Sequence, residues 1–228
     1  MISAEAYINA LSDRLAAHAN SDNAGQMERY MKNRFPFFGI KAPERKALVR
    51  AHRMEHGIPL DWQEVGVGLW EQDHREMQYA FNDMLEPRIR KQTPDLLPTI
   101  ETLIQSRSWW DTVDFLAPRL AGRVLEVHRE AMSAYPDKWI EHDNFWLQRS
   151  AIIVQLNWKS NTDEDRLYSY IRKRADSPEF FVRKAAGWAL RQYARVAPES
   201  VQRFVADTRL HPLTVREALK HIGSLDDG

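Results

Sequence analysis

The chain has 228 residues, of which 43% are apolar, so it can bury a large core and is not an intrinsically disordered protein. Lys and Arg together number 32, as do Asp and Glu, so the net charge is zero and gives no general attraction to a polyanion. The absence of cysteine excludes disulfides, thiolate metal sites and a cysteine nucleophile. No apolar run approaches the ~20 residues of a membrane span, and the start, Met1-Ile2-Ser3-Ala4-Glu5, lacks signal-peptide character. We therefore expect a cytoplasmic protein that makes no membrane contact.

The predicted elements are helices nearly throughout. Apolar residues recur at i, i+3 and i+4 in segments such as 146–156 and 182–193, and alternating strand patterns are missing. Prolines stand where helices should begin or end, at Pro43, Pro59, Pro94, Pro178, Pro198 and Pro212. No linker rich in Pro, Gly or Ser interrupts the chain, so we expect a single domain over residues 1–228.

A repeat emerges when sites of the type basic-x-Ala are aligned. The lead positions are 45, 78, 114, 149, 183 and 216, spaced by 33, 36, 35, 34 and 33 residues. Such a period is typical of stacked helix pairs, so the sequence predicts an all-α, HEAT-like superhelix, that is, an α-α solenoid. The lead residues should line one face of it, the concave one. Asp114 then stands out, because four of the other lead positions carry Arg.

Charge is unevenly distributed along the chain. Residues 28–53 hold eight basic and two acidic residues, residues 54–101 ten acidic and four basic, and residues 166–195 eight basic and two acidic. Two basic zones can contact phosphates despite the zero net charge, because binding depends on local potential. Solvated helix faces are the alternative interpretation of the same pattern.

The segment Ser108-Trp109-Trp110-Asp111-Thr112-Val113-Asp114 carries the strongest chemical signal. Ser108 is a candidate N-cap, and Asp111 would lie in the first turn, where the helix dipole explains a carboxylate. Asp114 lies one turn deeper and shares a face with Trp110. A carboxylate beside an indole suits the stabilisation of a cationic, sugar-like transition state, whereas a core Trp with an Arg-paired Asp is the structural alternative.

Two later segments supply cations and aromatic rings. Arg149 occupies the same repeat position as Asp114, and its guanidinium could hold a phosphate or pair with Asp114; the sequence leaves both open. In the stretch 180–191, aromatic and basic side chains interleave as they do in a nucleic-acid groove. Phe180 and Phe181 could instead be part of the hydrophobic core. A glycine inside a helix, as at Gly187, lowers helix stability by ~1 kcal/mol relative to alanine. We therefore expect another helix or a ligand to approach closely at this position. Gly-rich phosphate loops and metal-ligand spacings are missing, so we expect no metal and no cofactor.

These segments resemble the AlkD-type DNA alkylation-repair glycosylases. The resemblance spans about residues 16–222 and is most specific in Trp109-Trp110-Asp111-Thr112-Val113-Asp114 and Asp143-Asn144-Phe145-Trp146-Leu147-Gln148-Arg149. It implies a superhelix whose concave groove holds double-stranded DNA, and hydrolysis of the N-glycosidic bond of cationic N3- and N7-alkylpurines in base excision repair, without base flipping. This chain has Asn157 where the family often has Lys.

The resemblance also implies roles for individual residues. Asp114 would be the catalytic carboxylate, and Trp110 and Trp188 would pack on the deoxyribose of the lesion. DNA-binding residues would be Arg149, Tyr30, Phe180 and Phe181, to which the basic pattern of residues 180–191 adds Lys184 and Arg191. No Lys nucleophile is required, so we expect a monofunctional, monomeric glycosylase that does not cut the strand.

Two other functions fit the sequence less well. A non-catalytic helical-repeat protein that binds distorted or branched duplex would keep the basic zones but would not need Asp114. A protein-interaction scaffold, a common use of helical solenoids, would have an apolar or mixed groove and bind with little dependence on salt.

Overall fold

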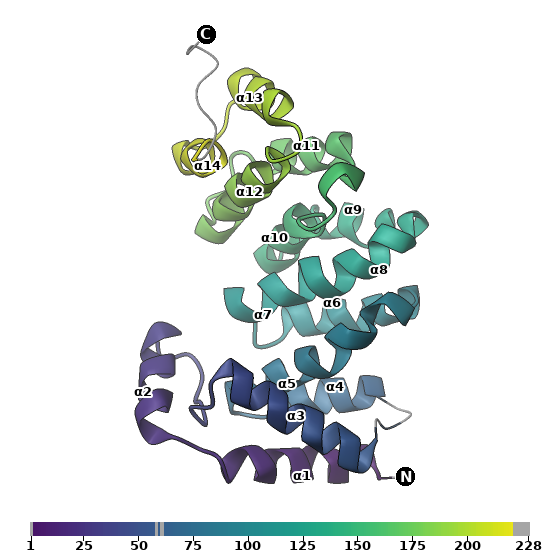
Figure 1. The fold of residues 1–228 in the computed structure, drawn as a ribbon. Helices are drawn as coiled ribbons and strands as arrows, with labels where there is room; N and C mark the ends of the chain where they lie inside the picture. The colour runs from purple at the N-terminus through teal and green to yellow at the C-terminus, as the bar shows by residue number, and fades with distance from the viewer. Residues whose placement is uncertain (1, 58, 60–61, 221–228) are drawn as a thin grey trace. The chain divides into compact units, whose positions relative to one another are not determined.

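The computed structural model describes residues 2–57, 59 and 62–220. All regular elements among these residues are helices, which confirms the all-α, helical-repeat fold class (Figure 1). Within the same residues, no helix has the length and apolar character of a membrane span.

The helices group into two compact units, Met1–Lys91 and Gln92–Gly228, and the expectation of a single domain stays a prediction. The first unit contains α1 (Ala4–Ala16), α2 (Ser21–Tyr30), α3 (Ala42–His56), α4 (Trp62–Glu71), α5 (Arg75–Leu85) and η1 (Glu86–Lys91). The second contains η2 (Pro94–Leu96), α6 (Leu97–Gln105), α7 (Trp110–Phe115), η3 (Leu116–Ala121), α8 (Gly122–Val127), η4 (Arg129–Met132), α9 (Pro136–Trp139), α10 (Phe145–Ile153), η5 (Lys159–Asn161), α11 (Glu164–Lys173), α12 (Phe180–Tyr193), α13 (Pro198–Asp207) and α14 (Pro212–Ala218).

The prolines mark helix starts as the sequence predicts. Pro43, Pro94, Pro198 and Pro212 all lie in the first turn of a helix. There the missing N–H costs nothing, because the first N–H groups of a helix have no partner within it. Helices α1, α2, α10 and α11 begin instead at a side chain of Ser, Asn or Asp that accepts a backbone N–H.

In the first unit, a buried carboxylate fixes the loop between α2 and α3. Glu76, in the first turn of α5, is fully buried and accepts the backbone N–H groups of Phe38, Gly39 and Ile40 at 2.9–3.1 Å. Gly39 has a φ of +85°, and a Cβ there would lie 2.0 Å from the carbonyl oxygen of Asn20. Only glycine fits this approach, which explains a glycine at the start of the segment 39–45.

In the second unit, α10 packs against α6, α7 and α12, and α12 packs against α14 (Figure 1). Buried indoles fill the spaces between these layers and find polar partners. Trp158 Nε1 donates to the carbonyl oxygen of Gly122, and Trp139 Nε1 donates to Glu101, both at 2.8 Å. Each of these indoles therefore adds apolar area to the core without leaving its N–H unsatisfied.

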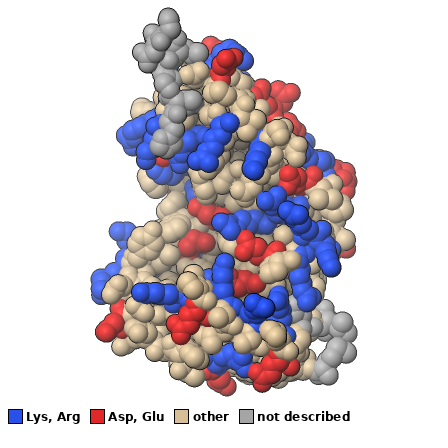
Figure 2. Space-filling model, in the orientation of Figure 1, with Lys and Arg blue, Asp and Glu red and all other residues tan. Residues whose placement is uncertain are grey.

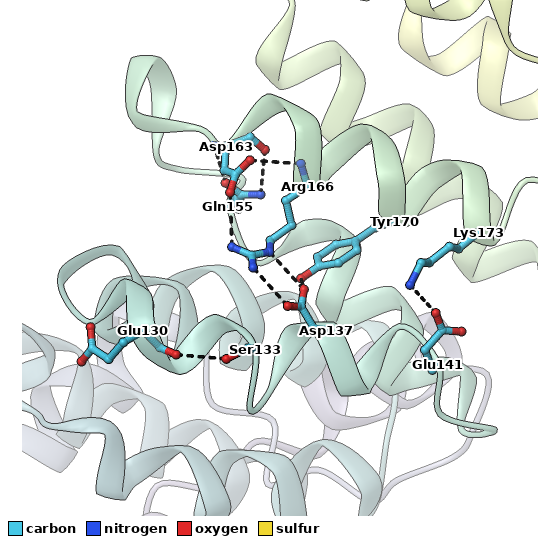
Figure 3. A network of polar contacts seen from close by, with 9 residues as sticks. All are labelled: Glu130, Ser133, Asp137, Glu141, Gln155, Asp163, Arg166, Tyr170 and Lys173. Carbon is cyan, nitrogen blue, oxygen red and sulfur yellow. Dashed lines mark hydrogen bonds and ion pairs between the residues drawn. The ribbon is translucent and has the colours of Figure 1, made fainter.

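A polar network joins α9 to α11 in the second unit (Figure 3). The guanidinium of Arg166 donates to both oxygens of Asp137 at 3.0 Å, and Tyr170 donates its hydroxyl to the same carboxylate. Arg166 also contacts Asp163, the N-cap of its own helix, at 3.2 Å. Adjacent helical layers are thus held by directional contacts as well as by apolar packing.

We expect Glu76→Gln to lower the free energy of unfolding by about 3 kcal/mol, because the amide offers one acceptor oxygen and brings an NH₂ group toward three backbone donors. Urea unfolding followed by circular dichroism measures this. Glu64→Gln is the matched control, since Glu64 is exposed on α4. Equal midpoints for the two variants would contradict the role given to Glu76.

Candidate active site

Asp114 lies near the end of the short helix α7. Val113, just before it, and Leu116, two residues after it, are fully buried, whereas the Asp114 side chain keeps 19% of its area exposed. A π-helical turn, η3, follows at once and contains Pro118. Proline has no N–H for the regular helical bond, and a π turn accommodates the interruption. This irregular junction sets the direction in which the segment around Asp114 faces.

The predicted N-cap role of Ser108 is wrong. Ser108 is not the N-cap, because its hydroxyl donates to the carbonyl oxygen of Ile104 at 2.6 Å and so satisfies the last turn of α6. Trp109 is the extended residue before α7, and the helix begins at Trp110. Asp111 does lie in the first turn, and Trp110 is half-buried one turn before Asp114.

Arg149 on α10 pairs with Asp114, which is one of the two possibilities that the sequence leaves open for this Arg. Its Nε and Nη2 donate to the two carboxylate oxygens of Asp114, each at 2.7 Å. The Nη1 group donates to the carbonyl oxygen of Phe181 on α12 at 2.5 Å. The side chain of Arg149 is only 4% exposed. One buried guanidinium therefore links α7, α10 and α12.

Burial and charge act on Asp114 in opposite directions. Burial raises the pKa of its carboxyl above the ordinary value, the Arg149 guanidinium opposes that rise, and Asp111 adds to it. The net pKa is raised. Asp114 is consequently a partly exposed carboxylate of raised basicity, fixed in one orientation by two parallel hydrogen bonds.

Aromatic rings pack beside this pair. The ring of Phe181 lies 5.1 Å from that of Trp109 and 4.9 Å from that of Trp146, and the Arg149 guanidinium lies 5.9 Å from the Phe181 ring. Phe180 contacts Phe181 edge-on and is 55% exposed. Phe181 thus belongs largely to the packing that supports Arg149, whereas Phe180 presents its ring to solvent.

Comparisons with known proteins assign the chain to a family. The sequence profile of the family described as DNA alkylation repair enzyme matches residues 11–222. The chain belongs to this family. A solved structure of a predicted DNA alkylation repair enzyme from Enterococcus faecalis is similar to it, with a TM-score of 0.83 and 30% sequence identity over 90% of this chain and 97% of that chain. A search among curated proteins gave no significant match. The predicted resemblance is confirmed, and the protein has its role in the repair of alkylated DNA.

Within this repair protein, Gly187 allows two helices to touch, as predicted. A Cβ there would lie 2.5 Å from the Cβ of Glu217 and 2.9 Å from the carbonyl oxygen of Thr214, both on α14. Trp188, the next residue of α12, is half-buried. The close approach therefore fixes the segment of α12 that carries Trp188.

Glu217 is a residue that the sequence analysis missed. Its carboxylate pairs with Lys184 and with Arg191, each at 2.7 Å, and these hydrogen bonds lower its pKa to about 2. Lys184 and Arg191, two of the cations expected to bind DNA, are thus already paired with a carboxylate. Sequence could not assign Glu217 to them, because it lies 26 residues beyond Arg191 on another helix.

Most lead residues of the repeat connect helices instead of lining an open face, which differs from the expectation. Arg45 is buried and pairs with Asp83 at 2.8 Å, and Gln78 is fully buried and donates to carbonyl oxygens at the end of α4. Arg149 behaves in the same way. The last lead residue, Arg216, is exposed. The period of the repeat reflects helix-to-helix contacts.

Two further residues singled out in the sequence, Tyr30 and Asn157, lie in different parts of the structure. Tyr30 is the last residue of α2 in the first unit and is 69% exposed. Asn157 donates its side-chain amide to the carbonyl oxygen of Pro118 at 3.2 Å, and so satisfies the π-helical turn that follows Asp114.

We expect Arg149→Gln to lower the free energy of unfolding by about 3 kcal/mol near neutral pH, because a buried carboxylate then loses its cation. The pKa of Asp114 would rise further above its value in the unfolded chain. A raised folded pKa makes ionisation unfavourable in the folded state, so the penalty is absent below the unfolded pKa and grows as the pH rises toward the folded one. The loss should thus be smaller near about pH 4 than at neutral pH.

Urea unfolding at several pH values checks this expectation. Arg216→Gln is the matched control, since it removes an exposed Arg at the same repeat position. Adding Asp114→Asn to Arg149→Gln should restore part of the lost stability, because no charge is then left buried. A pH-independent loss would argue against the pairing as described.

Proposed function

We propose that the protein is a monofunctional DNA glycosylase that hydrolyses the N-glycosidic bond of N3- and N7-alkylated purines in double-stranded DNA. Membership of the DNA alkylation repair enzyme family supports the substrate class. The observation that carries the reaction is the Asp114 carboxylate, which is partly exposed while the guanidinium that orients it is buried. A non-catalytic binder of DNA would have no use for a carboxylate presented in this way.

The proposed reaction needs little acid assistance. Alkylation at N3 or N7 gives the purine a positive charge, so the electrons of the breaking C1′–N9 bond neutralise the departing base. The positive charge moves to the sugar, which becomes oxocarbenium-like. Asp114 stabilises that cation and orients the water whose oxygen bonds to C1′ and whose proton passes to the carboxylate or to solvent. The products are the neutral alkylated base and an abasic site.

Arg149 acts in this proposal as a positioning residue. Its two hydrogen bonds to Asp114 keep the carboxylate ionised and fix its direction before the substrate arrives. The contact of Arg149 with the DNA backbone that the resemblance implies stays a prediction, and it would use N–H groups of the guanidinium beyond those bound to Asp114 and Phe181.

The remaining candidate residues would bind the substrate. The indoles of Trp110 and Trp188 would contact the deoxyribose and add cation–π attraction of ~0.5–2 kcal/mol each as the sugar becomes positive. Tyr30 and Phe180 have exposed rings that would contact the DNA, and Phe181 packs behind Phe180. Lys184 and Arg191 would exchange their ion pairs with Glu217 for contacts with DNA phosphates. Chemistry directed at the sugar requires no pocket for the base, so we propose that the base is not flipped and that a monomer suffices.

We expect Asp114→Asn to slow the release of 7-methylguanine from methylated duplex DNA by on the order of 100-fold. Released bases are measured by chromatography, and retained DNA binding and helicity show that the variant is folded. Asp111→Asn, three residues earlier on α7, should keep the activity because its carboxylate is explained by the helix start. Retained DNA binding with unchanged release in Asp114→Asn would refute the catalytic role and leave a binding protein.

The rate of base release should depend on pH through Asp114. Its ionised form is the active one, so the rate falls as the pH drops through the pKa of this carboxyl. Because burial raises that pKa, the acidic limb should lie above the ordinary value of about 3.9. Single-turnover rates, corrected for spontaneous release at each pH, measure the limb. A limb that persists unchanged in Asp114→Asn would assign it to another group.

A further inference from the structure

A cavity of about 310 Å³ opens in the second unit between the loop after α11 and the loop after α13. Ala175, Asp176, Ser177 and Pro178 line it from the first loop, Arg209, Leu210, His211 and Pro212 line it from the second, and Arg183 lines it from α12. Arg209 is exposed. Lys and Arg side chains gather on the visible surface around α12 and α14 (Figure 2).

The hydrogen bond that caps α14 favours one tautomer of His211. His211 is the N-cap of α14, and its Nδ1 accepts the backbone N–H of Leu213 at 3.0 Å. An accepting Nδ1 needs its lone pair, so the proton of the neutral ring lies on Nε2. His211 therefore presents an N–H donor at Nε2.

That donor faces a second donor. Nη1 of Arg183 lies 2.7 Å from Nε2 of His211, and a guanidinium has no lone pair to offer. In this tautomer two N–H groups meet, which cannot bond to each other and whose positive ends repel. An oxygen that accepts from both would remove the repulsion.

Arg183 also differs from the other Arg residues at its repeat position. Arg45 and Arg149 each pair with an aspartate at 2.7–2.8 Å. For Arg183, the contacts among the described residues are the carbonyl oxygen of Pro178 and the ring of His211, and its Nε is buried without a partner. Its charge is thus not neutralised by a carboxylate bound to it.

We propose that this cavity binds an oxyanion of the phosphate class, which accepts from Arg183 Nη1 and His211 Nε2 and is held electrostatically by Arg209. Tetrahedral oxyanions present several acceptor oxygens and match converging N–H donors. Asp176 also lines the cavity, and its negative charge makes binding of a free anion weak. The group can be free inorganic phosphate or a backbone phosphate of DNA; the second source rests on the proposed function.

The site itself is tested with inorganic phosphate. Sodium phosphate is titrated against sodium chloride of equal ionic strength, and the ¹⁵N resonances of the Arg183 guanidinium are followed by NMR. A saturable shift is expected for the wild-type protein and for Arg203→Ala, which removes an exposed Arg of α13 that does not line the cavity. The shift should be lost in Arg209→Ala and in His211→Ser, where Ser can keep the helix cap but has no side-chain N–H to act as the second donor. No saturable shift, or equal shifts in all variants, would overturn the site.

The source of the phosphate is tested with duplex DNA. The logarithm of the binding constant is plotted against the logarithm of salt concentration, and Arg209→Ala should reduce the slope by about 0.9 relative to Arg203→Ala if one backbone phosphate is bound. Equal slopes alongside a saturable phosphate shift would overturn the backbone source and support free phosphate. Neither result depends on base release, so failure of the glycosylase assay would leave the anion site standing.

Discussion

The contact between Arg149 and Asp114 is the constraint on which the second unit depends. A carboxylate in this partly buried position has a raised pKa, and the guanidinium that opposes the rise also reaches the backbone at Phe181. The same hydrogen bonds thus connect α7, α10 and α12 and fix the orientation of the Asp114 carboxylate. Removal of either partner leaves the other charge buried, which links the stability of the unit to the integrity of its candidate active site.

Similar contacts recur along the chain and explain why the repeat carries polar residues at its lead positions. Arg45 pairs with Asp83, and Gln78 satisfies carbonyl oxygens at the end of α4. Apolar helix faces alone would allow neighbouring layers to slide, whereas a guanidinium or amide with defined partners fixes their register. The network of Asp137, Arg166 and Tyr170 between α9 and α11 does the same with other residues.

Some cations of the second unit are bound to carboxylates, and others lack such a partner among the described residues. Glu217 binds both Lys184 and Arg191, so these side chains are oriented by α14 before any contact with DNA. Arg183 faces the ring of His211 without a paired carboxylate, which distinguishes it from Arg45 and Arg149 at the same repeat position. A chain with zero net charge can bind a polyanion in this way, because a few cations remain uncompensated locally.

The sequence by itself determined the helical fold class, the helix starts at Pro43, Pro94, Pro198 and Pro212, the family and the position of Asp114 on a helix. These features follow from local periodicity, from the missing N–H of proline and from short motifs, all of which act within a few residues. Only the tertiary structure decided that Arg149 pairs with Asp114, that Ser108 satisfies α6 and does not cap α7, and that Glu217 holds two expected DNA ligands. Ion pairs such as these join residues 26–35 positions apart, and their partners depend on which helix faces meet, which the charge pattern of one helix does not specify.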